Sequence, residues 1–223
     1  MHELELIGLD GSNLLAYLAA LGTLRVLSDS GVQVRMSWRE KRWWTPVIHS
    51  QFDSADALLD CLAPRVCGSE TLNEACRISD NLKFSRQSFA QLLDRSVNES
   101  SPQERLNADF LCAFGSDAFG KGKEQQIEDT ELRAIGAGNE QHFLAFMQQL
   151  AENTNSQHLR RTLFVEWDYG DDKPSMRWDP ADYRPHALRA KDPSRDDIRT
   201  MRGANRLAIE RFLYSRPRLR QRP

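Results

Sequence analysis

The N-terminal third of the chain holds the clearest pattern of hydrophobic and polar positions. Residues 3–7 alternate apolar and charged side chains, which indicates a short strand. In residues 14–27 large apolar side chains recur at spacings of three and four, so one face of a helix is apolar. Small residues such as Ala19 and Gly22 lie on the other surface and permit another element to pack closely there. Ser12 or Asn13 is a natural N-cap. We predict a largely buried helix whose apolar face comprises Leu14, Tyr17, Leu18, Leu21 and Leu24.

Alternation resumes at residues 32–38, which we predict to be a strand, and residues 43–48 are expected to return beside it. Pro46 favours an edge position for this second strand, because proline cannot donate a ladder hydrogen bond. Periodic apolar positions predict further helices over residues 54–62 (ended by Pro64), 85–97, 139–152, 157–164 and 203–214.

Two segments lack periodicity. Residues 114–139 are rich in glycine and polar residues, and we predict a long functional loop there, while residues 167–193 are expected to be irregular. The polar segment 98–102 is the best candidate for an internal boundary. The pattern therefore predicts an α+β fold: a small N-terminal sheet packed on a buried helix within residues 1–97, and a mostly helical second half in residues 98–223.

Composition narrows the class of protein. Hydrophobic residues make up 40% and charged residues 28% of the chain, which is ordinary for a globular protein. No segment is apolar enough to span a bilayer and no signal peptide is visible, so we expect a cytoplasmic protein without a membrane partner. The four cysteines are Cys61, Cys67, Cys76 and Cys112. Their spacing is irregular and contains no Cys-x-x-Cys pair, so we expect free buried thiols. We expect neither a metal nor a cofactor.

Charge is unevenly distributed along the chain. The formal net charge is −2, yet the chain from residue 184 onward is rich in arginine, so the preceding part is acidic. An arginine-rich end favours an anionic partner, of which nucleic acid is the commonest. The alternative is that these arginines contact the acidic surface of another protein.

Two segments combine cations with groups suited to nucleic acid. Arg39, Lys41 and Arg42 lie among the tryptophans of residues 38–44, where phosphate contact and base stacking could combine, although a hairpin with its tryptophans in the core would read the same way. The second segment surrounds Gly203 at a predicted helix start and consists of Arg199, Arg202, Asn205 and Arg206. These side chains could hold a phosphate backbone. The alternative is that they form salt bridges within the protein.

Residues 115–121 match Gly-x-x-x-x-Gly-Lys, the spacing of a phosphate-binding loop. The next residue, Gly122, stands where that loop needs a hydroxyl for Mg²⁺, which argues against nucleotide hydrolysis. Asp117, Lys123 and Glu124 could belong to a metal-dependent nuclease, or Lys121 and Lys123 could simply form a basic loop that touches nucleic acid.

Several strings resemble the large-subunit proteins of type I CRISPR effector complexes, subtype I-G (formerly I-U). The opening GLDGSNLLAYLAALGTLR at residues 8–25 is similar to the start of that family. Later strings follow in the same order: RWDP at 177–180, ALR at 187–189, DPS at 192–194 and GANRLAIE at 203–210. After about residue 210 the sequence departs from the family, so we expect a chain that is truncated or frameshifted at its C-terminal end.

The resemblance implies a non-catalytic subunit of the RNA-guided complex called Cascade, with guide RNA, target DNA and other effector subunits as partners. Such a subunit would contact the flanking motif of foreign DNA and dock the separate helicase-nuclease, while base pairing reads the sequence. No catalytic residues carry over. Two alternatives stay open: a nucleotide- or metal-dependent nuclease that uses residues 115–124, and an interaction scaffold for an acidic partner.

Overall fold

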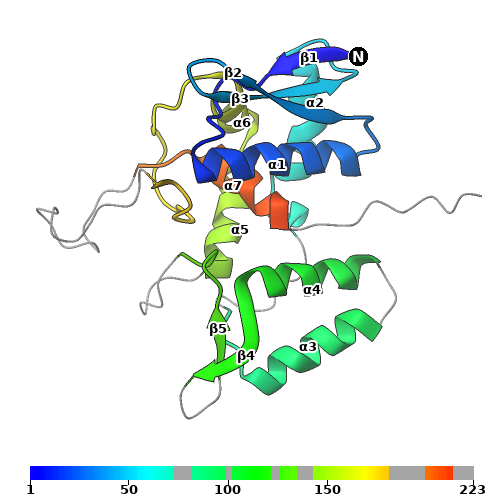
Figure 1. The fold of residues 1–223 in the computed structure, drawn as a ribbon, viewed down its shortest axis with the longest axis vertical. Helices are drawn as coiled ribbons and strands as arrows, with labels where there is room; N and C mark the ends of the chain where they lie inside the picture. Colours follow the sequence, from blue (N-terminus) through cyan, green and yellow to red (C-terminus); the bar gives the residue numbers. More distant parts are fainter. Residues whose placement is uncertain (73–81, 99–101, 122–125, 135–142, 181–198, 213–223) are drawn as a thin grey trace, which may run out of the picture.

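The computed structural model describes residues 1–72, 82–98, 102–121, 126–134, 143–180 and 199–212. The fold is α+β, as predicted: an antiparallel sheet lies on one side of a long helix, and helices dominate the rest (Figure 1). The sheet contains β1 (His2–Glu5), β2 (Arg35–Glu40) and β3 (Trp44–Ser50) in the order β1-β3-β2. No helix within these ranges is long and apolar enough to cross a bilayer.

Pro46 lies in the central strand of this sheet, so the prediction of an edge position is wrong. The backbone oxygen of Pro46 accepts a hydrogen bond from the backbone N of Leu6 (2.9 Å), which places that side of Pro46 towards β1. The register of β1 ends one residue pair earlier, at Glu5 opposite Val47. The backbone N–H that Pro46 lacks would therefore lie just beyond the last residue pair between β1 and β3. Only the end of the sheet loses a hydrogen bond.

The first helix, α1 (Leu14–Asp29), begins at Asn13, whose side chain accepts a hydrogen bond from the backbone N of Ala16 (3.2 Å). Its most buried positions are on the face of small residues, including Ala19, Ala20 and Gly22. Of the predicted apolar face only Leu18 is buried; Leu14 and Tyr17 are exposed, and Leu21 and Leu24 are half-buried. The buried side of α1 combines these small residues with Leu15, Val26 and Leu27, so a different face of the helix is turned to the core than the prediction assigned.

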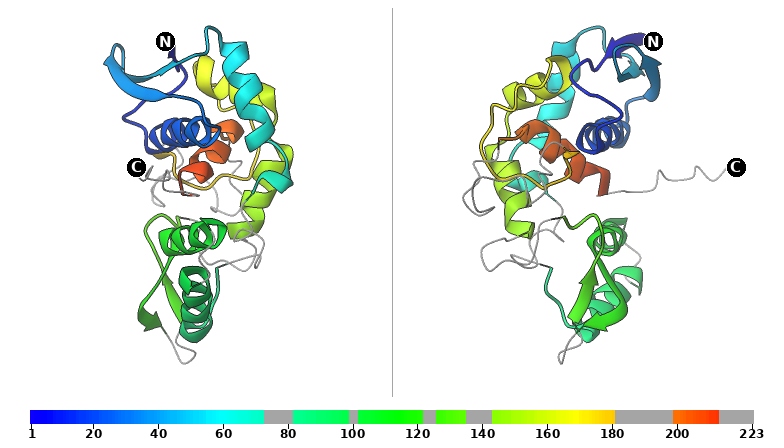
Figure 2. Two further views of the ribbon diagram at one scale, coloured as in Figure 1. Left: turned by 90° about the vertical axis from the view of Figure 1, so that its right-hand side faces the viewer. Right: turned by 60° about the vertical axis from the view of Figure 1, so that its left-hand side comes forward.

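Two glycines let the helices around α7 (Arg202–Phe212) approach closely. A Cβ atom on Gly22 would lie 1.9 Å from the backbone oxygen of Leu207, so α1 and α7 contact through their backbones. A Cβ atom on Gly203 would lie 2.5 Å from the backbone oxygen of His158 in α6 (Ser156–Phe164). The helix α7 is therefore held between α1 and α6, at the centre of the upper part of the molecule (Figures 1 and 2).

The other predicted helices are present. They are α2 (Ala55–Val66), α3 (Arg86–Asn98) and α5 (Phe143–Asn153), together with α6 and α7. Pro64 does not end α2, because a proline in the last turn removes only one helical hydrogen bond. The short helix η1 (Ser69–Thr71) follows α2.

The lower part of the molecule contains α3, α4 (Pro102–Phe114) and a hairpin of β4 (Gly115–Lys121) and β5 (Gln126–Asp129) (Figure 1). This hairpin corrects the prediction of a long loop over 114–139, of which residues 122–125 and 135–139 lie outside the described residues. Helices α3 and α4 flank the predicted boundary at 98–102 and pack against each other. The division into 1–97 and 98–223 stays a prediction.

Candidate nucleic-acid interface

Arg206 and Asn205, predicted to face a phosphate backbone, have fully buried side chains, and for these two residues the prediction is wrong. Arg206 Nε donates to the backbone oxygen of Val66 (2.8 Å), and Nη2 donates to Thr71 Oγ1 (3.0 Å). Asn205 Nδ2 donates to Thr200 Oγ1 (2.9 Å). Internal bonding, the alternative considered from the sequence, accounts for both residues.

Glu210 lies between two guanidinium groups. Its Oε1 is 2.7 Å from Nη1 of Arg206, and its Oε2 is 2.6 Å from Nη1 of Arg25. The carboxylate is almost completely buried, so both ion pairs are shielded from water. The three side chains join α1 to α7 electrostatically.

Three strings that carry the resemblance, 8–25, 177–180 and 203–210, meet in the same region. Asn13 Nδ2 donates to Asp179 Oδ1 (2.9 Å), which links the first string to the second. The backbone N of Met176, one residue before the second string, donates to Asn205 Oδ1 (2.8 Å). The polar side chains of these strings thus support the fold; the strings 187–189 and 192–194 lie outside the described residues.

Arg199 and Arg202 lie before and at the start of α7 beside an acidic turn. Arg199 is exposed and pairs with Asp172 (2.9 Å), whereas Arg202 is half-buried and its Nη1 reaches the backbone oxygen of Asn153 at 3.5 Å. The buried carboxylate of Asp171 accepts hydrogen bonds from Arg161 Nη1 (2.8 Å) and from the backbone N of Arg202 (2.9 Å). The backbone amide at the helix start is therefore occupied by a carboxylate of the chain itself rather than open to a phosphate.

The β2–β3 hairpin carries the other predicted nucleic-acid contacts, Arg39, Lys41 and Arg42. Arg39 forms ion pairs with Glu3 (2.8 Å) and Glu5, and Lys41 pairs with Glu5 (2.5 Å). The Arg39 hydrogen bond holds the pKa of the Glu3 carboxyl below its ordinary value, and those from Lys41 and Arg39 do so for Glu5. These acids stay charged and neutralise the two cations, so a nucleic acid gains little from them.

The tip of the hairpin, Arg42–Trp44, is more accessible than the ion-paired Arg39 and Lys41. The Arg42 side chain is 75% exposed, its Nη1 lies 3.3 Å from Glu166, and its guanidinium carbon lies 5.0 Å from the centre of the Trp43 ring. Trp44 is 48% exposed, whereas Trp38 is half-buried and stacks on Tyr17 with ring centres 5.7 Å apart. The indole of Trp44 and the guanidinium of Arg42, two residues apart, are thus both accessible, a combination suited to a base and a phosphate.

Residues 115–121 form the strand β4, which follows the C-terminal end of α4. A phosphate-binding loop instead precedes a helix, whose first backbone amides hold the anion. The described part of the Gly-x-x-x-x-Gly-Lys match therefore lacks the geometry of such a loop. Lys121 ends β4, Asp117 is half-buried within it, and Gly122, Lys123 and Glu124 lie outside the described residues.

The cysteines differ in exposure from the prediction of buried thiols. Cys61 and Cys67 are half-buried and Cys112 is exposed, all three as free thiols, while Cys76 lies outside the described residues. Burial raises the pKa of the Cys67 thiol, so it is less reactive than an ordinary cysteine. Within the described ranges, no three or more histidine, cysteine or acidic side chains gather in a way that could hold a metal ion.

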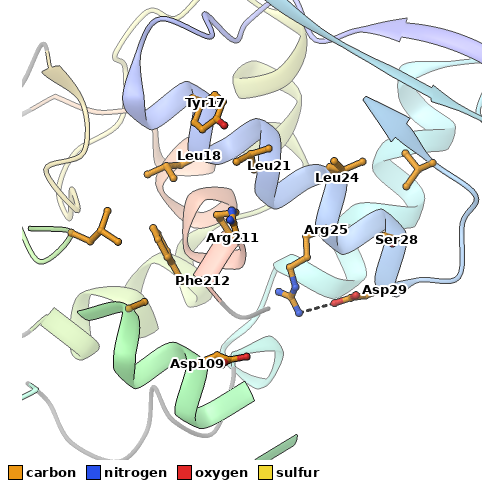
Figure 3. Close-up of a pocket in the computed structure, with 13 residues that line it drawn as sticks. Tyr17, Leu18, Leu21, Leu24, Arg25, Ser28, Asp29, Asp109, Arg211 and Phe212 are labelled. Atoms are coloured by element: carbon orange, nitrogen blue, oxygen red, sulfur yellow. Dashed lines mark ion pairs between the residues drawn. The ribbon is translucent and has the colours of Figure 1, made fainter. Parts of the chain in front are cut away.

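A groove that the sequence did not predict runs along the outer face of α1 (Figure 3). It has a volume of about 920 Å³ and lies between α1 on one side and α4 with the end of α7 on the other. The signal was present in the sequence, because Tyr17, Leu21 and Leu24 belong to the apolar face that we assigned to the core. Periodicity marks an apolar face but does not tell whether the protein itself covers it.

Compared with protein-family models, with curated proteins and with solved structures, the chain matches none.

Proposed function

We propose that this chain is a non-catalytic subunit of an RNA-guided, nucleic-acid-binding complex, of the kind formed by the large subunits of type I CRISPR effectors, and that it works in the cytoplasm. Its nucleic-acid contact is the hairpin tip, Arg42–Trp44. The observation that carries this proposal is that an exposed indole, Trp44, and the highly exposed guanidinium of Arg42 lie two residues apart on this hairpin.

The chemistry of the tip favours a single strand over a duplex. An indole ring can stack on any base whose face is free, and bases offer their faces only when they are unpaired. Arg42 forms an ion pair with Glu166, and both side chains are largely exposed, so this ion pair is weak and a phosphate can replace the carboxylate. Such contacts would not depend on the base sequence, in keeping with a subunit that leaves sequence recognition to a guide RNA.

The resemblance supports membership in such a complex. Its first, second and last strings are far apart in the sequence, yet Asn13, Asp179, Arg25 and Glu210 connect them through direct contacts. Residues that build the fold are the ones that distant relatives must share, so these strings are informative about fold. Arg199 remains exposed and can add a second phosphate contact, whereas Arg202 and Arg206 are used internally.

The test is binding of a fluorescent single-stranded oligonucleotide to the purified chain over a range of salt concentrations. Base stacking on an aromatic side chain contributes about 1–3 kcal/mol, so Trp44→Ala should weaken binding roughly 5- to 150-fold. Arg42→Ala should lower the slope of log affinity against log salt by about 0.7. Arg65→Ala, which removes an exposed arginine on α2, is the matched control and should change neither quantity.

Binding that is unchanged in both Trp44→Ala and Arg42→Ala would place the nucleic acid elsewhere. Membership in the complex has its own test: the chain should co-purify with guide RNA when the other effector subunits are co-expressed. A chain that never carries RNA, or that hydrolyses ATP or cuts DNA without partners, would overturn the proposed function.

A further inference from the structure

Three polar side chains contact one another in series across the three strands of the N-terminal sheet (Figure 1). Glu3 of β1 lies directly opposite His49 of the central strand β3, and Ser37 of β2 lies diagonal to His49 on the same face. Ser37 Oγ is 2.7 Å from His49 Nε2, and His49 Nδ1 is 3.6 Å from Glu3 Oε1. A hydroxyl, an imidazole and a carboxylate in this order are the parts of a serine nucleophile with its general base.

This face of the sheet is turned away from the core. Trp38, the neighbour of Ser37 in β2, stacks on Tyr17 of α1, and successive side chains of a strand point to opposite faces. Ser37 is accordingly exposed, and His49 is half-buried. A reagent in solution can therefore reach the hydroxyl, while the imidazole behind it is partly shielded from water.

The charge of Glu3 decides which nitrogen of His49 carries the proton. Arg39 donates to Glu3 (2.8 Å), and this hydrogen bond holds the pKa of the Glu3 carboxyl below its ordinary value. Near neutral pH Glu3 is therefore charged and can only accept a proton or a hydrogen bond. A carboxylate on the Nδ1 side favours the tautomer with the proton on Nδ1, which leaves Nε2 to accept from the Ser37 hydroxyl.

A second arginine faces the same histidine. Arg35 lies directly opposite His49 on β2, two residues before Ser37, and its Nη2 donates to Met1 Sδ (3.6 Å). This cation disfavours a protonated His49, whereas the charge of Glu3 favours one. Because Arg35 is on the same face as Ser37, it also favours the negative oxygen that forms when a hydroxyl attacks a carbonyl.

We propose that Ser37 is a nucleophilic serine that takes an acyl group from an activated ester or thioester, with His49 as its general base and Glu3 as a positioning residue. Ser37 Oγ forms a bond to the acyl carbon, and the bond from that carbon to the leaving oxygen or sulfur breaks. The hydroxyl proton passes to His49 Nε2 and from there to the leaving group. An exposed sheet face holds a substrate only weakly, so we expect one modified serine per chain rather than steady turnover.

A fluorophosphonate, which reacts with activated serines, tests the proposal on the full chain, and mass spectrometry locates the label. We expect Ser37 to be labelled at least about tenfold faster than Ser12. Ser12 is the matched control within the same chain, because it is exposed and its Oγ donates to Asp10 Oδ1 (2.7 Å) rather than to a histidine. The acyl donor p-nitrophenyl acetate should likewise acetylate Ser37 in preference to Ser12.

Variants of the other two residues test their roles. His49→Gln should slow the labelling of Ser37 about tenfold or more, because glutamine can hydrogen-bond to the hydroxyl but cannot take its proton. In His49→Ala, added imidazole should restore part of the rate, which it would not do if the histidine were only structural. Glu3→Gln should slow labelling to a smaller extent, and Glu3→Asp should retain more of the rate. Thermal melts establish that the variants fold; if the His49 variants do not, the comparison of Ser37 with Ser12 still decides.

Equal labelling of Ser37 and Ser12, or an unchanged rate in His49→Gln, would overturn the proposal and leave a cross-strand hydrogen bond only. Steady release of nitrophenol that Ser37→Ala abolishes would support the site and contradict the non-catalytic part of the proposed function. The oligonucleotide measurements on Arg42 and Trp44 involve none of these side chains. Either proposal can therefore fail without the other.

Discussion

At the scale of single residues, Arg206 has its whole guanidinium inside the protein. Each of its nitrogens lies near a named partner, namely Val66, Thr71 or Glu210. Removing one member of a buried ion pair leaves the other charged group without compensation in a poorly solvated place. Glu210 would retain Arg25 alone, and two acceptors on the chain would lose their donor.

Arg206→Ala should therefore lower the free energy of unfolding by about 3 kcal/mol. The matched control, Arg199→Ala, removes an exposed arginine that pairs with exposed Asp172, and should cost less than about 0.5 kcal/mol. Urea denaturation monitored by tryptophan fluorescence measures both. An Arg206→Ala protein as stable as the parent would mean that the buried network contributes nothing.

His158 gives the stability a dependence on pH. Burial, more than any other cause, lowers the pKa of its imidazole below the ordinary value of 6.5; nearby Arg202 and Arg161 lower it further, and Asp171 opposes them. In the unfolded chain the imidazole takes up its proton at a higher pH than in the folded one. Protons therefore favour the unfolded state, and this part of the stability is lost as pH falls through about 6.5.

We expect the urea midpoint to decrease between about pH 7.5 and about pH 5.5, and His158→Gln to reduce the decrease. Glutamine is a suitable replacement because His158 Nδ1 accepts a hydrogen bond from the backbone N of Asn155 (3.1 Å), and a glutamine oxygen can do the same in a capping box. The same pH dependence in the variant would assign the effect to other groups.

At the scale of elements, the packing of α1 against α7 depends on the absence of one side chain. Gly22 is in the middle of α1, where alanine would favour the helix by about 1 kcal/mol if the helix stood alone. A Cβ atom there would lie 1.9 Å from the backbone oxygen of Leu207, which no rotamer change can relieve. The contact between helices thus outweighs helix propensity.

Gly22→Ala should destabilise the protein by about 2 kcal/mol or more, because α1 and α7 must separate to admit the methyl group. Ser28→Ala, at an exposed position of α1, should instead be neutral or slightly stabilising. Thermal melts of the two variants give the comparison. A stabilised Gly22→Ala would show that the two helices are less close than described.

At the scale of the whole molecule, an aromatic cluster connects the lower part to the upper part. Phe114 at the end of α4 lies with its ring centre 4.8 Å from that of Phe143 in α5 and 4.9 Å from that of Phe212 in α7. Trp178 stacks on the same ring at 6.2 Å. Phe114 is fully buried, so α4, α5 and α7 share one apolar contact centre.

Phe114→Ala should cost about 3–5 kcal/mol, because it removes a fully buried ring at the meeting point of these helices. We also expect amide hydrogen exchange to speed up in α4 more than in α1. Phe146→Ala, at a half-buried position of α5, is the control and should cost less. If both variants lost equal stability, the cluster would have no special role in joining the two parts.

The groove along α1 and the hairpin tip are neighbours in the upper part of the molecule. Tyr17 borders the groove, and its ring stacks on Trp38, whose strand β2 leads to the tip at Arg42–Trp44.

The sequence by itself determined the fold class and the presence of most elements. Asn13 before a run of apolar residues specifies where α1 begins, and Phe143, Met147 and Leu150 specify the buried face of α5. These signals are local: a cap, a turn and a periodic face all act within a few residues. They could therefore be read without knowing what packs against them.

The tertiary structure alone decided which of these residues remain available for binding. Arg206 and Arg199 belong to the same arginine-rich segment, yet Glu210, Val66 and Thr71 bury one, and the other stays exposed. The same holds for Leu18 and Leu21 of α1, whose exposure depends on neighbours from distant segments. Burial and pairing are set by contacts between residues far apart in the chain, and no periodicity within one segment records them.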